Sequence, residues 1–200
     1  MTVQGTSGIE IGLKQLVSII CKLHRISADA EGAMRARLKH FQRLGFPPGT
    51  NTGTGKRAAY DSSAVLSICL ALDLTKMQLT PEEAVALIKE HPAIFRTARE
   101  IAQAEPDAAD RSLDPRFLMI EYTSLLVANL EIGARYKIAI GSLGEAVAKW
   151  NPNTDLARSS VSWLCLTYVV LALNRSLRSA GLPALYVGEL PNEPNYPEMF

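Results

Sequence analysis

In the first hundred residues, apolar positions recur every three or four residues, a spacing typical of amphipathic helices. Charged and small polar residues lie between them, so each segment has one apolar stripe and one polar face. The helices predicted from this spacing cover residues 9–26, 30–44, 62–77, 80–91 and 93–105.

Local signals mark where two of these helices begin and end. Gly45 follows the helix over 30–44 at a position typical of a C-terminal cap. Thr80 precedes Pro81, and Glu83 follows at the capping-box position, so a helix is predicted to begin there.

The pattern changes in the second half of the chain. Residues 106–115 are polar and acidic and end in proline, which is typical of a linker. The segment over 116–130 is dense in apolar residues and fits a strand or a helix, and 134–142 alternates as a strand does. A long apolar helix is predicted over 155–181.

These elements predict a mainly α fold with a small β component. We expect residues 1–105 to form one domain and 106–115 to form a linker. A second region over 116–188 should hold the long helix and two strands, and the proline-rich tail over 189–200 should be flexible.

Charge is distributed unevenly along the chain, although the net charge is +1. Residues 1–60 hold nine Lys or Arg and three Asp or Glu, a net charge of +6, whereas residues 61–200 carry −5. The segment 32–60 contains six basic residues and no acidic one. This asymmetry indicates a polyanion partner for the first part, although a solvated basic face would have the same composition.

The glycine-rich segment 45–61 lies inside this basic region and has some features of a nucleotide-binding loop. The P-loop pattern requires a glycine where Thr50 stands and a hydroxyl residue where Arg57 follows the lysine. A basic amphipathic helix also precedes the segment, where a P-loop requires a strand. We therefore predict a basic β-hairpin, or wing, that returns through a short strand at 58–60.

Three short segments follow one another in a set order: RLGFPP at 43–48, KRAAY at 56–60 and TPEEAVALI at 80–88. In this order they resemble the DNA-binding domain of MerR-type transcriptional regulators, and the resemblance covers residues 10–91. It implies a winged helix-turn-helix domain whose second helix enters the major groove of DNA while the wing contacts the backbone or minor groove.

Candidate DNA contacts follow from the chemistry of the basic residues in the second helix and the wing. Arginine forms paired hydrogen bonds with guanine, whereas lysine acts more as a point charge. Arg35 and Arg37 are therefore the candidates for reading base edges. Phosphate contacts are expected from Lys39, His40 and Arg43 on the helix and from Lys56 and Arg57 on the wing.

The long helix predicted over 155–181 is apolar on nearly every side, and such a helix must be buried. The second half of the chain offers little material to cover it. We therefore predict a homodimer that binds a two-fold symmetric site. Its interface candidates are Trp163, Leu166, Tyr168, Val170 and Leu173.

Catalytic and metal chemistry find little support in the sequence. The three histidines are not paired with a serine or cysteine nucleophile, and neither G-x-S-x-G nor H-E-x-x-H occurs. The cysteines are far apart in apolar patterns and form neither a metal-ligand pair nor a disulfide framework. They are Cys21, Cys69 and Cys165. We predict no enzyme activity, no metal and no cofactor.

The polar N-terminus lacks a signal-peptide core, and the apolar run 161–173 is too short to span a bilayer. We therefore expect a cytoplasmic, nucleoid-associated transcriptional regulator without membrane contact. Its expected partners are double-stranded DNA, a second copy of the chain and RNA polymerase. The alternative is a protein–protein adaptor that uses its winged domain without sequence-specific DNA binding.

Overall fold

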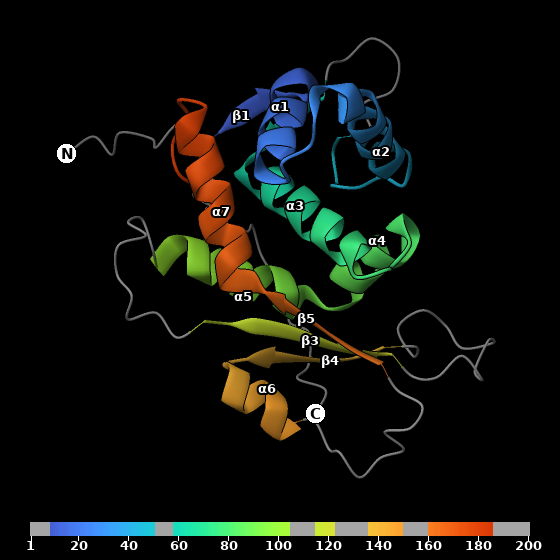
Figure 1. Ribbon diagram of the computed structural model, residues 1–200, viewed down its shortest axis with the longest axis vertical. Coiled ribbons are helices and arrows are strands. Elements are labelled where there is room, and N and C mark those ends of the chain that lie inside the picture. The colour runs from blue at the N-terminus through green and yellow to red at the C-terminus, as the bar shows by residue number, and fades with distance from the viewer. Residues whose placement is uncertain (1–8, 51–57, 105–114, 123–135, 150–159, 186–200) are drawn as a thin grey trace.

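The computed structural model describes residues 9–50, 58–104, 115–122, 136–149 and 160–185 (Figure 1). Within these residues the fold is mainly helical with two small antiparallel sheets, which confirms the predicted α+β class. The predicted linker 106–115, except its last residue, and the predicted tail 189–200 lie outside the described residues.

Helices dominate the first half of the chain, close to the predicted bounds. Two short strands, β1 (Glu10–Gly12) and β2 (Ala59–Asp61), pair antiparallel with Ile11 opposite Tyr60. A 3-10 turn over Ala28–Ala30 precedes the second helix. The α-helices are α1 (Leu13–Leu23), α2 (Glu31–Arg43), α3 (Ser62–Lys76), α4 (Pro81–Glu90) and α5 (Pro92–Ala104).

The second half contributes an antiparallel sheet in the order β4-β3-β5. In its register, Met119 lies opposite both Ala139 and Trp163. Helix α6 contacts β3 and β4, and α7 follows directly from β5 (Figure 1). The elements are β3 (Phe117–Tyr122), β4 (Tyr136–Gly141), α6 (Leu143–Lys149), β5 (Ser160–Cys165) and α7 (Leu166–Ser179).

The start of the predicted long helix over 155–181 is wrong. Residues 160–165 form the strand β5, and the helix begins only at Leu166. Strand pairing with β3 supplies backbone hydrogen bonds here, and valine and tryptophan favour a sheet surface. These long-range contacts outweigh a local apolar pattern that fits either structure.

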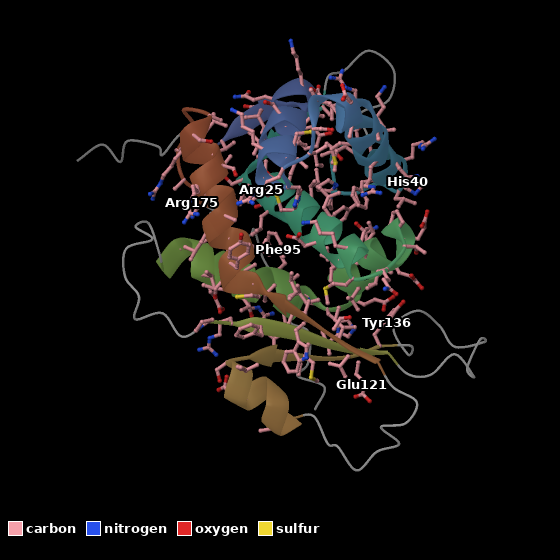
Figure 2. All side chains as sticks on the ribbon, viewed as in Figure 1. Arg25, His40, Phe95, Glu121, Tyr136 and Arg175 are labelled. Atoms are coloured by element: carbon pink, nitrogen blue, oxygen red, sulfur yellow. The ribbon has the colours of Figure 1, made fainter. Side chains whose placement is uncertain are left out.

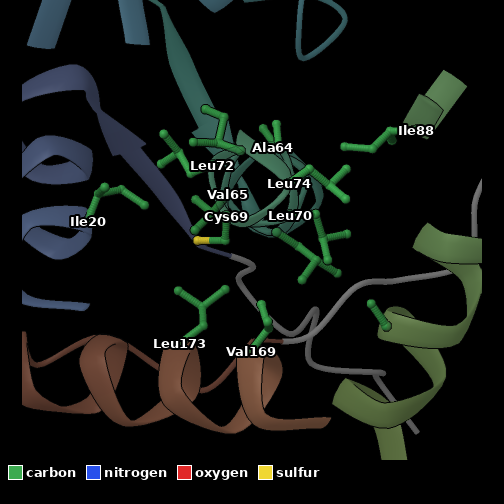
Figure 3. Packing of buried hydrophobic residues seen from close by; sticks show 14 of the residues in the cluster. Ile20, Ala64, Val65, Cys69, Leu70, Leu72, Leu74, Ile88, Val169 and Leu173 are labelled. Atoms are coloured by element: carbon green, nitrogen blue, oxygen red, sulfur yellow. The ribbon is translucent and has the colours of Figure 1, made fainter. Parts of the chain in front are cut away.

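Helix α3 lies at the centre of the fold. Twelve of its fifteen residues are buried, from Ser62 to Leu74. Its side chains extend toward Ile20 of α1, Ile88 of α4 and Leu173 of α7 (Figure 3). The helix that is covered on all sides is thus α3, and the prediction that the C-terminal helix is buried on nearly every side is wrong.

Helix α7 buries one face against the first half of the same chain. It contacts α1, α3 and α5 (Figure 1), and Leu118 and Ile120 of β3 belong to the same hydrophobic cluster. Described residues on both sides of the predicted linker therefore share one core. The predicted division into a 1–105 domain and a 116–188 region is not seen in their packing.

Candidate nucleic-acid interface

Helix α2 is anchored by a narrow apolar stripe. Met34, Leu38 and Phe41 are buried at i, i+4 and i+7. Gly45 adopts a φ of 67°, and the N–H of Phe46 donates to the carbonyl oxygen of Phe41 at 3.0 Å. This geometry confirms the predicted glycine cap. The Phe41 and Phe46 rings meet edge-on with centroids 6.2 Å apart, which ties the end of α2 to the segment after it.

The rest of the α2 surface is largely exposed and basic. Arg37, Lys39 and Arg43 are exposed, and within the described residues Arg37 and Lys39 make no hydrogen bond or ion pair. Gly32 and Ala36 are exposed between them. A helix with small side chains on its outer face can bring its backbone close to a partner surface. Long cations around that face can reach an anionic partner.

The two arginines predicted to read bases lie on different flanks of this surface. Successive helix residues are rotated by about 100°, so positions 35 and 37 are separated by about 200° around the axis. Arg35 forms an ion pair of 2.9 Å with Glu31, one turn earlier. The exposed face itself is centred on Ala36 and Arg43, each of which lies two positions from a buried residue.

His40, predicted to contact phosphate, is half-buried and engaged from two sides. Its Nδ1 lies 3.4 Å from the Arg43 guanidinium, and its Nε2 lies 2.8 Å from Oε1 of Glu82 on α4. In the tautomer with the proton on Nε2, Arg43 donates to Nδ1 while Nε2–H donates to the carboxylate. The pKa of Glu82 is lowered, first by the hydrogen bond from its own backbone and then by His40. His40 thus ties α2 to α4 and positions Arg43.

A second hydrogen bond fixes α2 to the strands. Nε2 of Gln42 donates to the hydroxyl oxygen of Tyr60 at 2.6 Å, and Tyr60 is fully buried in β2. Burial raises the pKa of the Tyr60 hydroxyl. This partner lies eighteen positions away, and nothing in the sequence near Gln42 indicates it.

The predicted wing residues Lys56 and Arg57 lie outside the described residues. The segment before them begins with buried Phe46, and the Thr50 hydroxyl donates to the carbonyl oxygen of Pro47 at 2.7 Å. The short strand expected at 58–60 is present as β2, but in the described residues its partner is β1 at the start of the chain. Among the described residues, this strand therefore pairs with β1 and not within the hairpin predicted over 45–61.

Another polar cluster joins α1 to α3. Nζ of Lys76 donates to Nδ1 of His24 and to Oδ1 of Asp73, both at 2.6 Å. Asp73 is buried on the apolar helix α3, and these contacts satisfy its charge. Burial is the largest cause that lowers the pKa of His24. The cluster stabilises the junction of the two helices.

The described residues contain neither a cluster of metal-ligating side chains nor a membrane-spanning helix. In the part of the chain that the structure describes, no three His, Cys, Asp or Glu side chains gather as a metal site would require. No helix among the described segments is long and apolar enough to cross a bilayer.

The residues predicted for a dimer interface divide into two groups. Leu166, Val170 and Leu173 are fully buried by α1, α3 and α5 of their own chain. Trp163 is 37% exposed and Tyr168 is 68% exposed. The burial of the first group removes the physical argument that this helix needs a second subunit to cover it.

The chain was also compared with known proteins. No family model matches it, and neither the curated proteins nor the solved structures contain a match. The resemblance to MerR-type regulators therefore rests on the residues of this chain and stays a prediction.

Proposed function

We propose that the protein is a transcriptional regulator that binds double-stranded DNA sequence-specifically. In this proposal α1 and α2 are the helix-turn-helix of a MerR-like winged domain, and α2 enters the major groove. The observation that carries the proposal is the two-sided build of α2. A narrow stripe is locked into the core, and Arg37, Lys39 and Arg43 are exposed around the rest of the helix.

The dimensions and chemistry of α2 suit this role. A helix fits the major groove of DNA, and exposed glycine and alanine allow its backbone to approach. Arginine can form paired hydrogen bonds with guanine, and lysine can bind phosphate. Arg37 and Arg43 are the proposed base-reading residues, and Lys39 is a proposed phosphate contact. Arg35, paired with Glu31, would contribute less.

Fixed attachment of α2 also supports specific recognition. The contacts of Gln42 with Tyr60 and of His40 with Glu82 hold the helix from two sides. A recognition helix that is already ordered pays less conformational entropy on binding. We further propose that Lys56 and Arg57 contact the DNA backbone or minor groove.

We propose that the regulator acts as a homodimer, since two copies match a palindromic site better than one. With three interface candidates buried in the chain, Trp163 and Tyr168 are the residues that remain available for this contact. Light scattering at micromolar concentration on the wild type and on a Trp163→Ser/Tyr168→Ser variant tests it. A monomeric wild type would contradict the proposed homodimer.

The DNA proposal is tested by selecting bound sequences from a random duplex library and measuring affinity by fluorescence anisotropy. The triple variant Arg37→Ala/Lys39→Ala/Arg43→Ala should lose most of the binding. Arg175→Ala is the matched control, because Arg175 lies on α7, away from the labelled His40 of α2 (Figure 2). If no sequence is enriched and heparin does not retain the protein, the adaptor alternative is favoured.

A further inference from the structure

A groove with a cavity volume of about 370 Å³ lies beside the end of α2. Its walls come from four parts of the chain: the segment after α2, the first turns of α3, the end of α4 and the start of α5. Phe46, Ser67, Lys89 and Phe95 are among the residues that line it. Phe95 is labelled in Figure 2.

The size and lining of this groove are those of a small-molecule site. Ligand pockets typically have volumes of about 300–1,000 Å³, with mainly apolar walls and a few polar groups that fix orientation. Here Phe46, Pro47, Ile88 and Phe95 provide apolar walls, and Ser67 provides a hydroxyl.

Two charged residues decide which ligand the groove suits. Asp61 caps α3, and its Oδ1 accepts from the N–H of Ala64 at 2.7 Å, so this carboxylate is oriented toward the first turn of α3. Lys89 is exposed at the groove and has no hydrogen bond or ion pair within the described residues. Lys89 therefore offers an unpartnered ammonium group beside an apolar cavity.

We propose that this groove binds a small amphipathic anion, a molecule with an apolar ring system and one carboxylate or sulfonate group. The rings lie between Phe46 and Phe95, and the anionic group pairs with Nζ of Lys89. No covalent step is involved.

Occupancy of the groove is coupled to α2 through Phe46, and this part of the inference rests on the proposed DNA-binding function. Phe46 lines the groove and packs edge-on against Phe41, which is fully buried under α2. A ligand that favours one position of Phe46 changes the DNA affinity by its difference in affinity for the two positions. The groove would then serve as an effector site.

The test uses 8-anilinonaphthalene-1-sulfonate as the probe and the full chain, followed by ¹⁵N NMR titration and probe fluorescence. We expect saturable one-to-one binding, with the largest shifts at Phe46, Ser67, Lys89 and Phe95. Lys89→Glu should weaken binding about tenfold, the size expected for loss of one charge-assisted hydrogen bond. Lys14→Glu reverses an exposed charge on α1 and should leave binding unchanged.

A second variant distinguishes a blocked groove from an unfolded protein. Ser63→Trp places a large ring at the groove and should block the probe while the melting temperature stays near that of the wild type. Shifts scattered over the surface, or wild-type binding by both Lys89→Glu and Ser63→Trp, would overturn the site. A peptide-sized footprint that extends beyond the groove would also overturn the small-molecule assignment.

The coupling has its own readout. DNA affinity should change at least threefold at saturating probe, and Lys89→Glu should abolish that change. Unchanged affinity would overturn the coupling. Saturable probe binding by a protein without DNA affinity would refute the proposed function but support the ligand site.

Discussion

Helices α2 and α3 are of similar length and follow one another along the chain, but they do opposite work. In α3, twelve of fifteen residues are buried, and its neighbours surround it. In α2, three residues are buried, and the rest are exposed or partly buried. Helix α3 therefore forms the centre of the core, whereas α2 packs on the core through one narrow stripe.

This difference explains how a basic surface can exist without harming stability. The charges of α2 remain in water, where they cost little and contribute little to folding. The positions of the helix are instead fixed by Met34, Leu38 and Phe41 and by two hydrogen bonds at its sides. Stability and recognition are therefore expected to separate when the two helices are mutated.

The largest effect is expected in α3. Leu70 is fully buried, and Leu70→Ala should lower the free energy of unfolding by about 2–5 kcal/mol, because it removes apolar contacts and leaves a cavity. Urea denaturation measures this change. Lys39→Ala on the exposed face of α2 is the control and should change stability by less than about 0.5 kcal/mol.

The second effect is expected in binding rather than in folding. Arg37→Ala should cost about 1–3 kcal/mol of affinity for the selected DNA sequence and less for random DNA, since it removes a proposed base contact. Lys39→Ala should weaken both by similar amounts and lower the salt dependence by roughly one unit. Anisotropy titrations on both DNAs at several salt concentrations measure this. If Arg37→Ala weakened binding to the selected and the random DNA equally, as Lys39→Ala is expected to do, Arg37 would not read bases.

A smaller effect is expected where α2 is attached. Tyr60→Phe leaves the Gln42 side chain without its partner and should cost about 0.5–1.5 kcal/mol of stability. A double-mutant cycle with Gln42→Ala isolates the pair by thermal or urea unfolding. Additive losses from the two changes would show that this hydrogen bond does not stabilise the position of α2.

The smallest effect is the pH dependence at the α1–α3 junction. Burial lowers the pKa of His24 in the folded chain, and the pKa of His91 is lowered for the same reason. The unfolded chain therefore binds these protons at higher pH, so stability should fall as the pH drops below about 6.5. His24→Gln should flatten the curve of unfolding free energy against pH between 7 and 5. If the curve of His24→Gln ran parallel to that of the wild type, His24 would not be a source of the pH dependence of stability.

Local signals predicted the parts of the fold that depend on neighbouring residues. The bounds of α2, the glycine cap at Gly45 and the capping box at Thr80 were all confirmed. Each depends on residues within four or five positions, which the sequence displays directly.

Contacts between distant segments could not be predicted in this way. Strand β5 exists because β3 pairs with it, and the partners of His40 and Gln42 come from α4 and β2. The choice of α3 as the central helix was also missed. Its apolar run is interrupted by Asp73, which pairs with Lys76 one turn later in α3 and with His24 at the end of α1. The contact with His24 could not be seen from the local pattern.

The most direct test of the central claim is photo-crosslinking from the outer face of α2. A benzophenone amino acid in place of exposed Ala36 should crosslink to the selected DNA duplex, and the same amino acid in place of exposed Arg175 on α7 should not. The affinity of each variant for the duplex is measured first by anisotropy, and crosslinking is done at a protein concentration at which the duplex is bound. Crosslinking from Arg175 but not from Ala36, with DNA bound in both samples, would contradict the assignment of α2 as the DNA-binding helix.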